Sequence, residues 1–349
     1  MSRRDFLRVC MSSAVVGVSA GYAYGAGRES LLPGRKALSE QGAAGVGSRV
    51  QAASGESPAC PSGFGSGDYC YQVATGWGKL PEGWTWGCTP AVACDSKDRV
   101  YVHSRSEHPI MIFDGEGNFL ACWGQGIHKN PHGISVDAQG NVFSVDQNNH
   151  CVYKFNPEGK LVLTLGTPGR PAEKAGEPFN EPTDASVAPS GEIFVSDGYK
   201  NSRVHKFSPD GRLIMSWGEE GKGPGQFTVP HCVRIAPDGG VWVCDRKNDR
   251  IQIFDQDGKF ISQWTGLHEP CCLHFDAKAD AVYVAEFAQR VSIFRRDGTL
   301  VCSWGGGRKS DKPGEFLGGP HGICADSRGN LYVAEAPLQA RLQKFIRQR

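Results

Sequence analysis

The chain repeats itself at intervals of 40 to 51 residues from about residue 69 onward, and this repetition constrains its fold more than any other feature. One unit reads Pro131-His132-Gly133-Ile134-Ser135-Val136-Asp137 and continues through residues 140–146, 152–155 and 161–166, which gives four short apolar runs separated by turn residues. The unit begins six times, at Thr89, Pro131, Pro182, Pro230, Pro270 and Pro320. The sequence therefore predicts an all-β, six-bladed β-propeller of four-stranded antiparallel blades over residues 68–349.

The last repeat lacks a fourth strand, because only four residues follow its third strand at residues 342–345. Residues 71–78, Tyr-Gln-Val-Ala-Thr-Gly-Trp-Gly, are similar to the fourth strands that end in Trp123-Gly124, Trp217-Gly218 and Trp304-Gly305. We therefore expect residues 71–78 to complete the last blade and close the ring, which removes the open sheet edges.

The recurring motifs Pro-His-Gly-Ile and Gly-Asn-Leu-Tyr-Val-Ala resemble those of the NHL repeat, which implies NHL-type blades. The composition agrees, because 46 glycines and only 4 methionines among 349 residues favour many tight turns over long helices. Lys and Arg number 38 against 37 Asp and Glu. Such a balance provides no charge excess for binding nucleic acid or an anionic membrane, so we expect neither partner.

The N-terminus has the pattern of an export signal. Ser2-Arg3-Arg4-Asp5-Phe6-Leu7 precedes 19 uncharged residues, 9–27, that contain no Leu, Ile or Phe and are too weakly apolar for a good membrane span. Residues 1–26 thus resemble a twin-arginine signal peptide, which implies export by the twin-arginine machinery, a periplasmic or secreted mature protein and no stable membrane span in it. An uncleaved membrane anchor is the alternative. The glycine-rich residues 27–67 predict a flexible linker.

Thirteen cysteines are unusual for an exported protein unless they are paired or buried. Cys10 lies in the predicted signal, so twelve remain, an even number that permits pairing without showing it. Most lie in apolar strand patterns and are expected to be small buried hydrophobic residues, among them Cys94, Cys122, Cys244, Cys302 and Cys324. No closely spaced pair of Cys-x-x-Cys motifs is present, which argues against a zinc knuckle.

Histidine occupies every second blade at the position that follows the start of each repeat. Around the ring this position holds Pro90, His132, Thr183, His231, Cys271 and His321. Alternate blades of a six-fold ring are related by 120°, and the innermost strands face the central channel, so we expect the three imidazoles to converge. Three neutral nitrogen ligands with a free fourth position describe a catalytic zinc site.

The alternative is that these histidines only reflect the history of the repeat. Cys271 in the same position is either a further soft ligand or a packing residue. The other seven histidines share no common position and are expected in the core or at the surface: His103, His108, His128, His150, His205, His268 and His274.

A second set of positions lies at the end of the second strand: Ser104, Asp146, Asp197, Asp245, Glu286 and Glu335. Acidic residues there commonly hold turns by accepting bonds from backbone amides. The next residues include Arg105 and Arg246, in blades one and four, which we expect opposite each other on the histidine face. Their guanidinium groups suit a carboxylate or a developing oxyanion, while plain surface arginines are the alternative. Tyr199 lies beside them, and a lowered pKa near a cation would make it a candidate general base.

Taken together, residues 70–346 resemble the peptidyl-α-hydroxyglycine α-amidating lyase family. The resemblance is carried by Phe-Asn-Glu-Pro-Thr-Asp at residues 179–184, by residues 196–203 and by residues 245–252. It implies that His132, His231 and His321 bind Zn²⁺, that Tyr199 is the catalytic base, and that Arg246 and Arg105 are active-site arginines. It implies cleavage of an N–C bond to release an amide and glyoxylate, from a small-molecule or peptide substrate that carries a carboxylate. No nucleotide or organic cofactor is implied.

Departures from the family pattern limit what the resemblance carries over. Gly322 stands where the family has an Asp that helps to hold a structural Ca²⁺, which argues against calcium here. Gly319 and Lys200 replace a Met and a Cys, and the second change removes one family disulfide. The chain contains no copper monooxygenase half, so the substrate could be another carbinolamide.

Two other classes of function stay open. One is a noncatalytic propeller that binds a protein or glycan, and the other is a calcium-dependent, lactonase-like hydrolase. The alternating histidines argue against the hydrolase, whose pore would hold calcium through Asp, Glu and Asn side chains.

Overall fold

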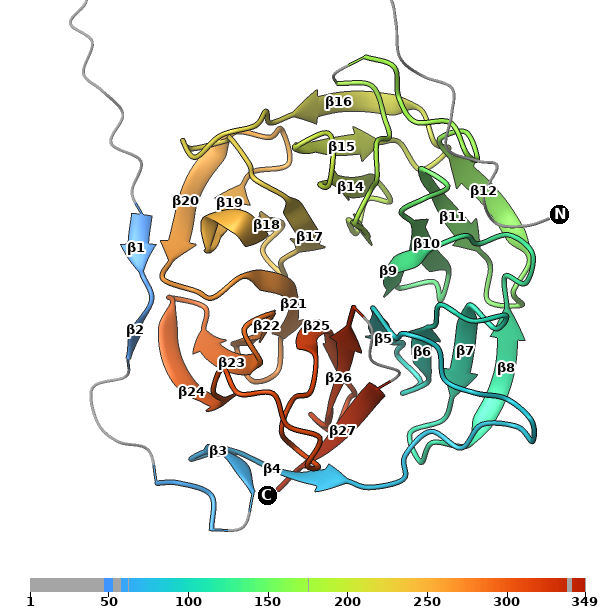
Figure 1. Ribbon diagram of the computed structural model, residues 1–349. Helices are drawn as coiled ribbons and strands as arrows, with labels where there is room; N and C mark the ends of the chain where they lie inside the picture. The colour runs from blue at the N-terminus through green and yellow to red at the C-terminus, as the bar shows by residue number, and fades with distance from the viewer. Residues whose placement is uncertain (1–46, 53–57, 62, 175, 338–340, 349) are drawn as a thin grey trace, which may run out of the picture. The chain divides into compact units, whose positions relative to one another are not determined.

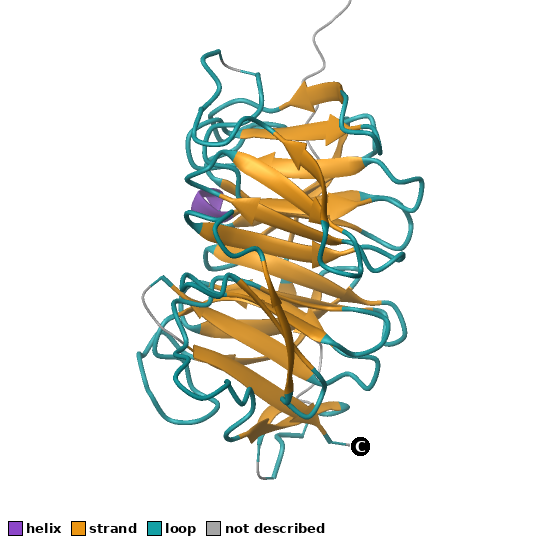
Figure 2. Ribbon diagram, turned by 90° about the vertical axis from the view of Figure 1, so that its right-hand side faces the viewer, coloured by secondary structure: helices purple, strands orange, loops and turns teal. Residues whose placement is uncertain are grey.

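The computed structural model describes residues 47–52, 58–61, 63–174, 176–337 and 341–348, all of which belong to one compact unit, Ala44–Arg349. Its strands form six sheets around a central axis, as the blades of a propeller (Figure 1), and the loops gather on the two faces of the ring (Figure 2). The predicted all-β, six-bladed fold is confirmed, since the only helical element in these residues is one 3-10 turn, η1 (Arg246–Asn248). None of the described residues forms a helix that could cross a membrane. The predicted signal peptide, residues 1–26, lies outside the described residues.

Blades 1 to 3 are four-stranded antiparallel sheets whose strands follow one another in chain order. Their strands are β5 (Val92–Cys94), β6 (Val100–His103), β7 (Ile110–Phe113), β8 (Phe119–Trp123), β9 (Pro131–Val136), β10 (Val142–Asp146), β11 (Cys151–Phe155), β12 (Leu161–Leu165), β13 (Asp184–Val187), β14 (Ile193–Asp197), β15 (Arg203–Phe207) and β16 (Leu213–Trp217). In each blade the first strand lies nearest the axis (Figure 1).

Blades 4 to 6 have the same antiparallel order, and each gains a further strand from the N-terminal part of the chain. Their repeat strands are β17 (Pro230–Ile235), β18 (Val241–Asp245), β19 (Arg250–Phe254), β20 (Phe260–Thr265), β21 (Pro270–Asp276), β22 (Ala281–Glu286), β23 (Arg290–Arg295), β24 (Thr299–Gly305), β25 (Gly319–Ala325), β26 (Leu331–Ala336) and β27 (Arg341–Arg347). The fourth strand of blade 6 is β4 (Tyr69–Ala74).

The ring closes through β4, as the sequence predicts. This strand pairs antiparallel with β27, with Val73 opposite Phe345 and Tyr71 opposite Arg347. Tyr71 is fully buried, and its ring centre lies 5.7 Å from that of Trp304 in the neighbouring blade. The first and last parts of the propeller thus share one sheet, which leaves no unpaired edge between β27 and the start of the ring.

Residues 27–67, for which the sequence predicts a flexible linker, contain strands in the part that the structure describes. Strand β1 (Gly47–Arg49) pairs parallel with β20, β2 (Gln51–Ala52) pairs parallel with β24, and β3 (Phe64–Ser66) pairs antiparallel with β4. The disulfide Cys60–Cys70 fastens this segment to blade 6. An exposed sheet edge offers its backbone groups to any extended chain. The pairing therefore requires no apolar side-chain pattern, and the composition of this segment does not predict it.

The core lies between the blades. The second strand of every blade is buried along its whole length, because each sheet packs against a neighbour on both faces. Cys244, Cys302 and Cys324 are buried in this core, whereas Cys94 and Cys122 are half-buried. Full burial of one Val, Ile or Phe side chain contributes about 1.5–3 kcal/mol, so the inter-blade contacts hold the inner strands rigidly around the axis.

Candidate metal centre

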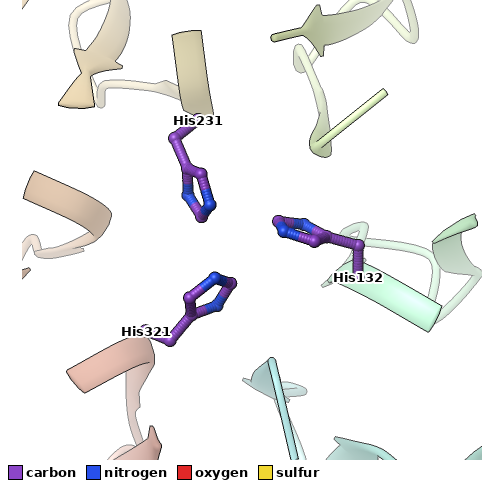
Figure 3. Close-up of side chains that lie close together, drawn as sticks. All are labelled: His132, His231 and His321. Atoms are coloured by element: carbon purple, nitrogen blue, oxygen red, sulfur yellow. The ribbon is translucent and has the colours of Figure 1, made fainter. Parts of the chain in front are cut away.

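Three histidines from alternate blades meet on the axis. His132 lies on β9, His231 on β17 and His321 on β25, and their rings point to a common centre (Figure 3). One ligand nitrogen from each lies within 4.8 Å of the others, and the ring centres are 4.6–4.9 Å apart. The side chains are almost fully buried, at 2%, 2% and 6% exposure. This group can hold one metal ion.

Each of these histidines is oriented by the blade that follows it. The Nδ1–H groups donate to the backbone carbonyls of Thr183, Cys271 and Pro90, at 2.7, 2.9 and 2.7 Å. These acceptors occupy the corresponding position in blades 3, 5 and 1, so every histidine bonds to its counterpart in the next blade. Such a bond fixes the tautomer and leaves the Nε2 lone pair free for a metal.

The electrostatic surroundings keep these imidazoles neutral. Burial lowers the pKa of His132 and His231 well below the usual value and that of His321 to about 3. Arg246 and Arg105 lower the pKa of His132 and His321 further. Neutral imidazole is the form that ligates metals, so the donor set suits Zn²⁺, which prefers nitrogen ligands, better than Ca²⁺ or Mg²⁺.

Tyr199 joins the histidines from the loop after β14. Its hydroxyl lies 2.9 Å from Nε2 of His132 and 3.1 Å from Nε2 of His231. The preceding Gly198 permits this approach, because a Cβ there would lie 2.0 Å from the carbonyl oxygen of Pro230. Burial raises the pKa of Tyr199, while Arg246 and Arg105 act in the opposite direction. A cation held by the histidines would add to the effect of the arginines.

Arg246 brings a positive charge to the same place. Its guanidinium carbon lies 5.4 Å from the ring centre of Tyr199 and 5.7 Å from that of Phe287, and its buried Nε has no partner among the described residues. Arg105 donates from Nε to the carbonyl oxygen of Pro131 at 3.2 Å. Two arginines beside a metal-binding group can hold a substrate carboxylate.

Phe287 is a site residue that the sequence reasoning missed. It occupies the position of Arg246 in the next blade, and its ring centre is 6.3 Å from that of His321. A signal was present, since Phe287 belongs to the same set of positions as the two arginines. From sequence alone, an aromatic residue in a propeller is assigned to the core, because its neighbours are not yet known.

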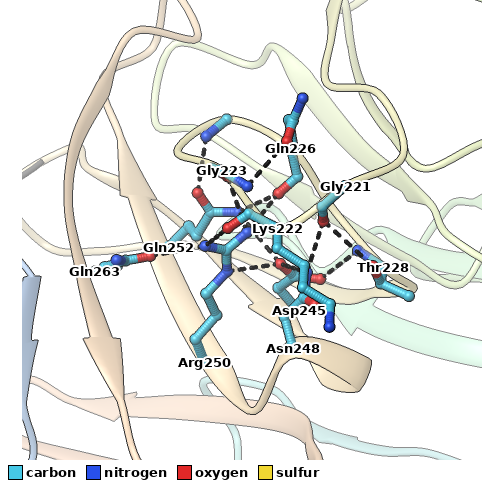
Figure 4. Close-up of polar contacts among 11 residues, drawn as sticks. Gly221, Lys222, Gly223, Gln226, Thr228, Asp245, Asn248, Arg250, Gln252 and Gln263 are labelled. Atoms are coloured by element: carbon cyan, nitrogen blue, oxygen red, sulfur yellow. Dashed lines mark hydrogen bonds and ion pairs between the residues drawn. The ribbon is translucent and has the colours of Figure 1, made fainter. Parts of the chain in front are cut away.

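A polar network surrounds Asp245 and Arg250, next to the turn that begins at Arg246 (Figure 4). The carboxylate of Asp245 accepts bonds from the backbone N–H of Thr228 and from the side chains of Asn248 and Arg250. Arg250 also donates to three loop carbonyls, those of Lys222, Gly223 and Gln226. The turn η1, which begins at Arg246, is thereby fixed to both the loop and the strand. The other acidic residues at this position, Asp146, Asp197, Glu286 and Glu335, likewise accept bonds from backbone N–H groups, which is the structural role the sequence predicts.

Replacing Arg250 by Met is expected to lower the free energy of unfolding by about 3–5 kcal/mol, because it leaves the buried carboxylate of Asp245 without its charged partner. Arg250 is only 5% exposed and Asp245 is fully buried. Denaturant titration measures the change. Arg212→Met is the matched control, since Arg212 pairs with Asp210 at the surface, and it should cost less than about 1 kcal/mol. Equal effects of the two substitutions would contradict the role of the network.

The axial space beside the histidines does not fit a calcium ion. A Cβ at Gly322 would lie 2.8 Å from the Cα of Ala91, so this backbone has no room for a carboxylate ligand there. Arg234 and Asp184 form an ion pair in this region, and the remaining space is about 10 Å³, enough for about one water molecule. Calcium needs six to eight oxygen ligands, and Asp184 is the only carboxylate among the described residues that line this space.

Cys271 is not a member of the metal-binding group that the structure describes. The only described cluster of metal-binding side chains consists of the three histidines. Burial raises the pKa of the Cys271 thiol to about 12, although Arg246 lowers it. This residue orients His231 through its backbone carbonyl oxygen.

Comparison with known proteins shows which proteins this chain is similar to. Residues 179–207 and 227–254 match the model of the NHL repeat. Human NHL repeat-containing protein 3 is 36% identical over 64% of this chain and 69% of its own length. A peptidyl-glycine alpha-amidating monooxygenase from Mus musculus is 36% identical over 50% of this chain, and peptidyl-alpha-hydroxyglycine alpha-amidating lyase 1 from Drosophila melanogaster is 36% identical over 51%.

The match spans only 21% of the mouse protein and 35% of the fly protein. Among solved structures, a gluconolactonase from Xanthomonas campestris superposes with a TM-score of 0.57 over 83% of this chain and 98% of its own, at 16% identity. A similarity at this identity establishes the shared fold alone.

Proposed function

Because this chain belongs to the NHL-repeat family, and because its axis carries three histidines with a tyrosine between them, we propose that it is a zinc-dependent lyase. The proposed substrate is a peptidyl-α-hydroxyglycine or a similar carbinolamide, which is cleaved to an amide and glyoxylate. The observation that carries the proposal is the position of the Tyr199 hydroxyl, within hydrogen-bonding distance of Nε2 of both His132 and His231. The similarity to the fly lyase supports the reaction class.

His132, His231 and His321 would hold the zinc ion. Bound there, zinc would supply Lewis acidity toward a substrate oxygen. The surrounding residues fit this role, since each Nδ1 is bonded to a backbone carbonyl, which leaves the lone pair on each Nε2, the atom that would bind the metal.

The chain's own residues would move the proton and hold the charge. As phenolate, Tyr199 accepts the proton of the substrate α-hydroxyl, the C=O bond of glyoxylate forms, and the N–C bond breaks with its electron pair going to nitrogen. The departing amide nitrogen then takes up one proton, which Tyr199 can return. Arg246, whose Nε has no partner among the described residues, and Arg105 hold the carboxylate in position during the cleavage.

The reaction and the metal can be tested together. The protein is purified without added metal, its zinc content is measured by mass spectrometry, and glyoxylate release from an N-acyl-α-hydroxyglycine is followed. We expect about one zinc per chain, together with turnover that a chelator abolishes and zinc restores. Zinc-loaded protein without glyoxylate release would refute the substrate assignment, and protein that takes up no metal would refute the lyase itself.

A binding propeller without catalysis is the second candidate. Among the relatives described above, human NHL repeat-containing protein 3 is matched over the largest share of this chain. Its name states a repeat and no reaction. A metal-free protein that retains full stability would favour this candidate.

A further inference from the structure

Two cysteines meet at the seam where the first and last blades of the ring adjoin. Cys94 ends β5 of blade 1, and Cys324 lies on β25 of blade 6. Their positions are 230 residues apart in the sequence, yet their Sγ atoms lie 3.0 Å apart. The thiols of Cys232 and Cys272, which face each other between blades 4 and 5, are farther apart, at 3.6 Å.

The backbones on both sides of this pair are held in register. The backbone N–H and the hydroxyl of Ser327 donate to the carboxylate of Asp98, both at 2.7 Å, just beyond the two cysteines. The hydroxyl of Thr89 donates to the carbonyl oxygen of Arg341 at 2.8 Å at the other end of the seam. The thiols are therefore brought together by a fixed interface rather than by a flexible loop.

The pair lies beside an opening to solvent. A pocket of about 1050 Å³ is lined by the residues that follow each cysteine, including Asp95, Ser96, Ala325 and Asp326. Cys94 is half-buried at this end of the strands, and Cys324 is buried. The same chain already contains one disulfide, Cys60–Cys70, which suits a protein that encounters oxidising conditions.

We propose that Cys94 and Cys324 form a disulfide that locks the innermost strands of the first and last blades together. The S–S bond forms as each thiol loses its hydrogen. The two electrons and two protons pass to the disulfide of oxidised glutathione or of a thiol–disulfide exchange protein, which is reduced to two thiols. The proposal is independent of the proposed lyase activity.

The bond would have two consequences. It would close a loop of about 230 residues, which restricts the unfolded chain and raises the thermal unfolding midpoint by about 5–10 °C. It would also steady the metal centre, because His321 lies three residues before Cys324 and donates to the carbonyl oxygen of Pro90, four residues before Cys94. Both partners of that hydrogen bond are close to the cross-link.

Peptide mapping tests the bond directly. The purified full-length protein is equilibrated with oxidised glutathione, alkylated during unfolding, digested without reductant and analysed by mass spectrometry. We expect a linked pair of peptides that contain Cys94 and Cys324. The disulfide Cys60–Cys70 serves as an internal control for sufficient oxidation. If Cys60–Cys70 has formed while Cys94 and Cys324 both carry the alkyl label, the proposal is wrong.

Substitution separates a covalent bond from mere packing. In oxidised protein, Cys94→Ala, Cys324→Ala and the double variant should lower the midpoint by the same 5–10 °C, because each removes the same bond. The difference from the parent should shrink sharply in a strong reductant. Cys232→Ala is the control, and its effect should not depend on reductant. Additive effects that persist in reductant would overturn the proposal.

Discussion

Tyr199→Phe is expected to reduce kcat by about a hundredfold or more while the fold and the zinc content stay unchanged. The phenyl ring keeps its packing beside Arg246, whereas the oxygen that lies 2.9 Å from His132 and 3.1 Å from His231 is lost. A positioned general base typically contributes 10²- to 10⁴-fold, so its removal should appear in kcat. Glyoxylate release is measured for parent and variant at equal zinc content.

The control for this substitution is Tyr153→Phe. The hydroxyl of Tyr153 accepts a bond from Asn149 in the core of blade 2, and its loss should affect stability while kcat stays near the parental value. If Tyr199→Phe turns over as fast as an active parent, Tyr199 is only a packing residue and another group must take the proton.

Replacing any one of His132, His231 and His321 by Ala is expected to abolish stoichiometric zinc binding and, with it, the lyase activity. Two nitrogen donors cannot maintain the tetrahedral frame that three provide. The chain offers a matched control in His268, which is exposed and lies outside the cluster, so His268→Ala should keep about one zinc per chain.

Zinc content is measured after dialysis against a weak chelator, and the midpoint of unfolding is recorded in parallel. Full zinc occupancy in all three single variants would show that the metal, if bound, lies elsewhere. A variant that loses both zinc and folded structure would be replaced by His→Gln at the same position, which retains most of the side-chain volume.

The periodic part of the structure could be predicted from sequence because each blade repeats the same turn and strand chemistry. The positions of His132, His231 and His321 follow from counting repeats, and the pairing of β4 with β27 follows from the missing fourth strand. Both inferences depend only on one blade resembling the next.

The features that could not be predicted depend on contacts that do not recur from one blade to the next. The pairing of β1 and β2 with β20 and β24 uses backbone groups at sheet edges, and no side-chain pattern marks it. The ion pair of Arg234 with Asp184 joins blades 3 and 4 through two residues at different positions of their repeats. Such contacts emerge only when the blades are placed around the axis.

Because each histidine bonds to the blade that follows it, the metal centre requires an even number of blades in the ring. Blades 2, 4 and 6 supply an imidazole, and blades 3, 5 and 1 supply only a main-chain oxygen to orient it. A ring with an odd number of blades could not alternate in this way, since two donors or two acceptors would adjoin. Pro90, Thr183 and Cys271 act on the histidines through their main-chain oxygens, so loss of a single blade would dismantle the centre even if every histidine were retained.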